Sequence, residues 1–251
     1  MADLSMMKLG KQAARRDNRS LAFAAYAANL ASAPDVCNNT DKITNLGMML
    51  NDTLGDCTCA TVGHIIQAWT AECGAQIILP DSVILALYEK FGYDPNDPST
   101  DGGAVILDVI KLWRTSGVEG HTIGAFAVLN TARLQEFKDG VYYFGSVYIG
   151  VQLPITAQNQ DIWDVVPNGG ANAVAGSWGG HAIPIVAYDG DFWYVITWGA
   201  IKKVTTAFLQ AYCDEGYVPF SNDILDKTSG KSPEGFDQDS LILDLKLVTS
   251  A

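Results

Sequence analysis

The sequence predicts a single α+β domain, and three observations point to that class. Helical periodicity dominates the first half of the chain, whereas short runs rich in β-branched and aromatic residues follow from about Val141. Helices that precede strands, rather than alternate with them, favour two packed subdomains over a wound parallel sheet. No repeat or linker divides the 251 residues, of which 48% are apolar, so one cooperative unit with a substantial core is expected.

The expected helices come from apolar spacing and turn signals. The longest, over residues 57–73, is expected to be half-buried, because apolar side chains recur at helical spacing behind Gly55-Asp56. Another helix begins near Pro80, and the next one follows the pair Gly102-Gly103. The complete set of expected helices covers residues 21–33, 57–73, 80–91, 104–116 and 205–213.

The expected strands lie in the second half of the chain and belong to one sheet. Their runs of Val, Ile, Tyr, Phe and Trp are separated by Gly, Asp and Pro, which is typical of short strands joined by turns. They cover residues 141–144, 147–153, 181–188, 192–198 and 240–248, with an exposed loop at 221–239. We therefore divide the domain into an N-terminal extension (1–44), a mainly helical subdomain (45–135) and a mainly β subdomain (136–251).

Charge and hydropathy exclude several classes of function. The 16 basic and 28 acidic residues give a formal net charge of −12 with no local basic run, which disfavours binding to nucleic acid or to an anionic membrane surface. No stretch of 18 apolar residues is present, so no membrane-spanning helix is expected. The region 11–33 has a basic part, an apolar part and a small-residue site like those of a signal peptide, but the basic part starts late and polar residues dilute the apolar part, so we expect a cytoplasmic or virion-associated protein and keep secretion as the alternative.

The cysteines predict reduced thiols. The chain has five, which cannot all pair, and a domain of this size does not need disulfides. Cys57 and Cys59 have no second close Cys/His pair, and four ligands must converge on a structural zinc ion, so neither a metal site nor a cofactor is expected.

Cys57 and His181 are the candidate nucleophile and base. A thiol reacts as the thiolate, and the N-terminus of the helix that Cys57 opens, together with a nearby imidazole, lowers its pKa. His64 lies two turns into the same helix and cannot fold back onto its start, and His121 lies in a connection. His181 follows a Gly-Gly pair at the start of a strand, which holds an imidazole at a strand end. Asp56 is expected to be a solvated turn carboxylate.

Four motifs, in this order, resemble those of the papain-like cysteine peptidases. Asn51 stands six residues before Cys57, where that family has a glutamine that stabilises the oxyanion. The segment Asp101-Gly102-Gly103 before a helix is similar to the family's Asn-Gly-Gly, where glycine lets the substrate backbone come close. The remaining two motifs are Gly179-Gly180-His181-Ala182-Ile183, similar to the family's His-Ala-Val strand, and Val195-Ile196-Thr197-Trp198-Gly199, similar to its Lys-Asn-Ser-Trp-Gly.

The resemblance implies a papain-like fold, in which a helical subdomain with a long central helix packs against an antiparallel sheet or barrel and the catalytic pair lies in the cleft between them. It implies that Asn51 stabilises the oxyanion, that Gly102 and Gly103 form a substrate-binding rim, and that Trp198 shields the contact that orients the histidine. No counterpart of the family's long inhibitory propeptide is evident, so control by zymogen cleavage is not expected.

The third catalytic position departs from the family's pattern. Counting from His181 places Thr197 where the family has asparagine, whereas alignment on Trp198-Gly199 places Ile196 there. A Thr197 hydroxyl can orient an imidazole, but an Ile196 side chain cannot, and a backbone carbonyl or a water molecule would then serve.

Three functional hypotheses follow. The first is a thiol-dependent hydrolase, most simply a cysteine peptidase that acts on peptide or protein substrates. The second, motivated by the missing asparagine, is a papain-fold protein without catalysis that serves as a binding or structural component, for example of a virus particle. The third is acyl transfer, as in transglutaminase-like enzymes. A cleft filled by the chain's own residues would favour the second hypothesis.

Overall fold

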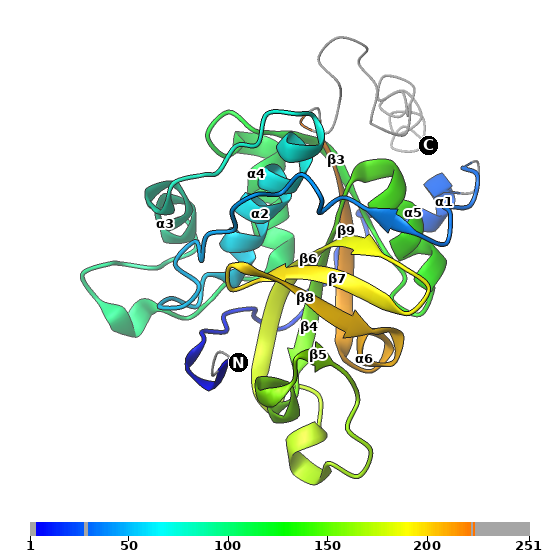
Figure 1. Cartoon of the computed structure of the whole chain (residues 1–251). Helices are drawn as coiled ribbons and strands as arrows, with labels where there is room; N and C mark the ends of the chain where they lie inside the picture. The colour runs from blue at the N-terminus through cyan, green and yellow to red at the C-terminus, as the bar shows by residue number, and fades with distance from the viewer. Residues whose placement is uncertain (1–3, 28–29, 222, 224–251) are drawn as a thin grey trace.

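A computed structural model describes residues 4–27, 30–221 and 223, and it combines helices with a large twisted sheet (Figure 1), which confirms the α+β class. The helices are α1 Phe23–Ala27, α2 Cys57–Glu72, α3 Asp81–Glu89, α4 Ile106–Ser116, α5 Leu134–Phe144 and α6 Thr206–Tyr212. The strands are β1 Leu21–Ala22, β2 Cys37–Asn38, β3 Ile123–Val128, β4 Val147–Leu153, β5 Ile162–Trp163, β6 Gly179–Tyr188, β7 Phe192–Thr197, β8 Ala200–Thr205 and β9 Cys213–Ser221.

The described strands form one nine-stranded sheet in the order β1-β3-β9-β4-β6-β7-β8-β5, with β2 paired to β6. Its central pairs are antiparallel, and the short strands β1 and β5 join β3 and β8 in parallel. Along β4, Ile149 packs in a core with α5 and α6, whereas Tyr148 packs in a second core with α2, α3 and α4. This alternation follows from the two-residue period of a strand, and it places one hydrophobic core on each face of the sheet.

Helix α2 is buried on every side. Its residues from Cys57 to Ala71 are all buried, so the expected half-buried helix is wrong in that respect. It packs against α3 and α4, with which it forms the helical wall of the domain, and against β6 of the sheet, which forms the opposite wall (Figure 1). A helix without a polar face belongs in the middle of a domain, where it needs no solvent-facing side.

The main error in the expected secondary structure concerns residues 141–144, which form the last turn of α5 instead of a strand. Phe137, Val141 and Phe144 recur at helical spacing on a buried face, and Gly145 ends the helix in the left-handed conformation (φ 75°). The local run of β-formers was therefore overridden by its longer-range helical period.

Other differences are smaller. Strands β3, β8 and β9 were not expected, and the helix expected over 21–33 is the five-residue α1. The strand expected at 240–248 lies outside the described residues. So does the loop expected at 221–239, apart from Ser221, which ends β9, and Asp223.

Candidate active site

Cys57 opens α2, and its thiol is 99% buried. Two backbone N–H groups contact the sulfur, one from Ala182 on β6 and one from Gly10 near the N-terminus. Burial raises the pKa of the thiol to about 12, and the two N–H groups offset part of that rise because they stabilise the thiolate. The contact with Ala182 brings the nucleophile candidate beside the residue that follows His181.

His181 is the third residue of β6, and it is also 99% buried. Its Nε2 lies 2.8 Å from the Thr197 hydroxyl oxygen, whereas its Nδ1 is buried without a hydrogen-bond partner among the described residues. The Trp198 indole stacks on the imidazole, with ring centroids 4.5 Å apart and planes 17° apart. Burial lowers the pKa of His181 to about 3, so the ring is neutral at pH 7 in this closed state.

The hairpin between β7 and β8 determines which residue meets the imidazole. Thr197 pairs with Ala200 across a two-residue turn in which Trp198 (φ 45°) and Gly199 (φ 68°) both have positive φ, as a type I′ turn requires. Ile196 packs in a small apolar cluster on the other side of the strand. Of the two alignments left open by the sequence, the structure therefore places Thr197 against His181.

Asn51 lies in the loop before α2, with its side chain buried. Its amide nitrogen donates to the Leu54 carbonyl oxygen at 3.1 Å and to that of Lys8 at 3.5 Å. The Trp198 indole nitrogen donates to the same Lys8 oxygen at 3.4 Å. The Lys8 carbonyl oxygen therefore accepts from both the Asn51 amide and the Trp198 indole.

The glycine pair on the helical wall is held by a short network. Asp101 Oδ1 accepts from the Gly55 N–H at 2.9 Å and from the Tyr88 hydroxyl at 2.6 Å. The Tyr88 oxygen in turn accepts from the Gly103 N–H at 2.8 Å. This network ties the loop before Cys57 to the rim that contains Gly102 and Gly103.

Residues 8–12 cross the cleft between the helical wall and the sheet. The Ala104 N–H donates to the Gly10 carbonyl at 2.8 Å, the Lys11 N–H donates to the Gly180 carbonyl at 3.1 Å, and the Gln12 N–H donates to the Ala104 carbonyl at 2.9 Å. The approach is close, because a Cβ added to Gly103 would lie 1.9 Å from the Gly10 oxygen. This segment, which we call the cleft segment, places Gly10 at the Cys57 thiol and Lys11 beside Gly180, the residue before His181. The sequence, in which no counterpart of a long inhibitory propeptide is evident, did not predict it.

Solved structures of cysteine proteases resemble this chain. Xylellain, a cysteine protease from Xylella fastidiosa, is 14% identical over 86% of this chain and 96% of its own, with a TM-score of 0.67. A procathepsin B from Trypanosoma congolense is 10% identical over 88% of each chain, with a TM-score of 0.58. A digestive procathepsin L 3 of Tenebrio molitor larval midgut is 11% identical over 86% of this chain and 77% of its own, also with a TM-score of 0.58.

The chain has the papain-like fold. No protein-family model and no curated protein matches the sequence. The likeness is therefore one of backbone arrangement, and the chemistry of this papain-like chain must be argued from its own residues.

Asp56 is not the solvated turn carboxylate expected from the sequence, because it is fully buried. Neither of its carboxylate oxygens has a hydrogen bond of good geometry among the described residues. Burial raises the pKa of Asp56 to about 8, against the opposing effect of the nearby Asn51 amide. The buried carboxyl immediately precedes α2, whose first residue is Cys57.

The other titratable candidates have separate environments. His64 is buried within α2, where burial lowers its pKa to about 4. His121 Nδ1 lies 2.8 Å from an Asp223 oxygen, away from the cleft.

Across residues 4–27, 30–221 and 223, no cluster of His, Cys, Asp and Glu is arranged to hold a metal ion. None of the helices described in those ranges has the length and apolar composition needed to span a bilayer.

Sequence reasoning missed the groups that interact with the cleft segment, namely Lys11 itself, Gly150 on β4, and Asp214 and Glu215 on β9. The two adjacent carboxylates lie just before the apolar run 217–220 of β9. That pattern was a usable signal, since a charged residue inside a buried strand needs a partner.

Proposed function

We propose that this protein is a thiol-dependent hydrolase, and specifically a cysteine peptidase, in a form whose cleft is closed by its own N-terminal segment. The observation that carries the proposal is the state of His181. One ring nitrogen is held by Thr197, and the other is buried without a partner at the strand start that contacts the Cys57 thiol. That is the arrangement a general base needs, because one nitrogen orients the ring and the other is left to take a proton.

In the proposed reaction the Cys57 sulfur attacks the carbonyl carbon of a peptide bond, and His181 accepts the thiol proton. The oxygen becomes negatively charged, and the Asn51 amide and the Cys57 N–H stabilise it. His181 then gives its proton to the leaving amine as the C–N bond breaks, which leaves a thioester on Cys57. Water, deprotonated by His181, hydrolyses the thioester and restores the thiol.

A filled cleft also favours a second function, a papain-fold binding or structural protein without catalysis. The cleft segment contacts Cys57, Asn51 and Trp198 at once. In a peptidase such a segment must leave the cleft before substrate enters, whereas in a structural protein it can stay permanently.

The test uses the full chain and the variant Lys11→Glu, which places a negative charge against Asp214 and Glu215 and so repels the cleft segment. We expect iodoacetamide to alkylate Cys57 at pH 7 at least about 100-fold faster in Lys11→Glu than in the wild type, since the thiolate fraction falls tenfold for each unit by which the pKa exceeds the pH. Peptide mapping by mass spectrometry identifies the labelled cysteine.

Two controls separate the candidates. Lys11→Glu/His181→Ala is expected to lose most of the acceleration, and Cys59, which is buried in the core, serves as the internal reference. Equal labelling of Cys57 with and without His181, together with no cleavage of a casein or peptide library by Lys11→Glu, would exclude the peptidase and support the non-catalytic protein.

A further inference from the structure

The side chain of Lys11 lies in a closed acidic pocket. Its ammonium nitrogen is 2.9 Å from Asp214 Oδ2 and 3.0 Å from Glu215 Oε1, and the side chain is fully buried. Glu215 is 7% exposed and Asp214 27%. A lysine is rarely buried to this extent, and it is tolerated here because two carboxylates meet its charge.

A β-bulge explains why two consecutive carboxylates reach one pocket. Along β4, Gly150 pairs with Glu215 and the next residue, Val151, pairs with Cys213, so Asp214 is an extra residue in β9. In a regular strand neighbouring side chains point to opposite faces. The bulge removes that alternation locally, which lets the Asp214 and Glu215 side chains bind the same ammonium group.

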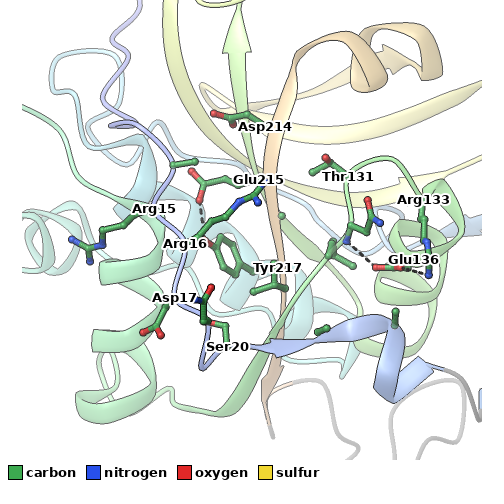
Figure 2. Close-up of a pocket in the computed structure, with 18 residues that line it drawn as sticks. Arg15, Arg16, Asp17, Ser20, Thr131, Arg133, Glu136, Asp214, Glu215 and Tyr217 are labelled. Carbon is green, nitrogen blue, oxygen red and sulfur yellow. Dashed lines mark hydrogen bonds and ion pairs between the residues drawn. The ribbon is translucent and has the colours of Figure 1, made fainter.

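The rest of the pocket is shaped for a long basic side chain. A Cβ added to Gly150 would lie 2.0 Å from Lys11 Cε, so the missing side chain of Gly150 makes room for the lysine stem. Hydrogen bonds from neighbouring side chains fix both carboxylates. Gln152 donates to Asp214 Oδ2 at 2.8 Å, and Tyr217 donates to Glu215 Oε2 at 2.9 Å. Figure 2 shows Asp214, Glu215 and Tyr217 along one strand at the edge of an adjoining groove.

The pocket lies beside the reacting centre. Gly150 pairs with Ala182 on β6, and the Ala182 N–H contacts the Cys57 thiol. Gly10, the residue before Lys11, also contacts that thiol through its N–H, and the backbone of Lys11 is held by Gly180. A peptide that binds in the same cleft and places one residue over Cys57 would therefore place its neighbour's side chain at Asp214 and Glu215.

We propose that Asp214 and Glu215 form a specificity pocket for a Lys or Arg side chain of the substrate, at the residue next to the one that lies over Cys57, and that Lys11 occupies this pocket as an internal mimic. The inference rests on the proposed peptidase function. When Lys11 leaves, two carboxylates lose their cation, and Arg15, the nearest arginine along the segment, pairs with Asp108 instead. A neutral substrate side chain leaves the buried acids unpaired, whereas a basic one restores the ion pairs.

The binding test does not depend on catalysis. The full-length variant Lys11→Glu/Cys57→Ala is titrated with a fluorescent peptide of sequence Met-Lys-Leu-Gly-Lys-Gln-Ala, which copies residues 7–13, and with the same peptide carrying norleucine for its second lysine. We expect the lysine peptide to bind at least about tenfold more tightly, with the preference falling at high salt. Equal affinity of the two peptides, or no binding of either, would overturn the proposal.

The kinetic test uses Lys11→Glu and matched internally quenched fluorogenic peptides with Lys or norleucine, and Arg or citrulline, at the residue that follows the one over Cys57, as Lys11 follows Gly10. We expect kcat/KM to favour the charged member of each pair at least about tenfold, and the preference to disappear in Lys11→Glu/Asp214→Asn/Glu215→Gln. Cleavage without a preference contradicts the pocket. Selective binding without cleavage of any peptide leaves the pocket standing and contradicts the peptidase.

Discussion

The two walls of the cleft build their halves of the site in different ways. On the helical wall, Cys57 is placed by a short continuous segment in which Asn51, Gly55 and the start of α2 follow one another. On the sheet wall, His181 and Thr197 come from different strands, and Asp214 and Glu215 come from a third. The helical half is therefore a local structure, whereas the sheet half depends on strand register and on one bulge.

The difference teaches where the site's reactivity is controlled. Cys57 and His181 are both neutral in the closed state because burial disfavours their charged forms, and Gly10 of the cleft segment lies at the Cys57 thiol. His64, by contrast, owes its low pKa to the interior of the helical wall alone.

The largest effect is expected from His181, the proposed base on the sheet wall. In the Lys11→Glu chain, His181→Ala should lower peptide hydrolysis by at least about 1,000-fold, because no other imidazole is beside Cys57 to accept the thiol proton. Cys59→Ala, on the same helix as Cys57, should change the rate little. Initial rates with a fluorogenic peptide measure both, and a comparable loss in the two variants would contradict the assignment.

The second prediction compares a histidine from each wall. In Lys11→Glu the pKa of His181 should rise from about 3 towards its ordinary value of 6.5, whereas that of His64 should stay at about 4, because opening the cleft hydrates only the former. Titration of the imidazole C–H signals by NMR reads both. Parallel shifts of the two histidines would show that the walls do not behave separately.

These lowered pKa values also have a defined effect on stability. Between pH 6.5 and about 4 the folded chain binds fewer protons than the unfolded chain, so the free energy of unfolding falls as the pH drops through that window. The loss is at most about 1.4 kcal/mol per pH unit for each histidine. Opening the cleft should remove the contribution of His181 to this pH dependence and leave the contribution of His64. Urea unfolding at several pH values measures both contributions.

The third prediction concerns Asp56 on the helical wall. Its pKa is raised from 3.8 to about 8, so the folded chain binds an extra proton and loses stability as the pH rises from about 4 to 8. Asp56→Asn should therefore raise the free energy of unfolding by about 1–3 kcal/mol at pH 8 and by much less at pH 4. A pH-independent difference between the variant and the wild type would argue against a buried carboxyl.

The smallest effect is expected at Thr197. Thr197→Val keeps the shape of the side chain but removes the hydrogen bond to His181, and it should lower kcat about tenfold in the Lys11→Glu chain with little change in KM. Thr197→Ser is the matched control that retains the hydroxyl. If valine and serine at this position behave alike, the hydroxyl does not orient the imidazole.

Most of the helical wall was predictable from the sequence because its signals are local. The bounds of α2, α3 and α4 follow from apolar spacing and from nearby glycine and proline residues, and the spacing from Asn51 to Cys57 lies within one loop. On the sheet wall, β4, β6 and β7 were also predictable, since each is a run of β-formers bounded by turn residues. Residues 141–144 were misjudged because four residues are too few to show a helical period.

By itself, the sequence determined the α+β class, the candidate nucleophile at a helix start and the candidate base at a strand start, since each depends on residues adjacent in the chain. Only the tertiary structure decided that Thr197 and not Ile196 meets His181, that Asp56 is buried, and that Lys11 lies between Asp214 and Glu215. The ion pair joins residues 203 and 204 positions apart, through a bulge that sets which side chains share a face. Contacts of that kind depend on strand register, which local patterns do not encode.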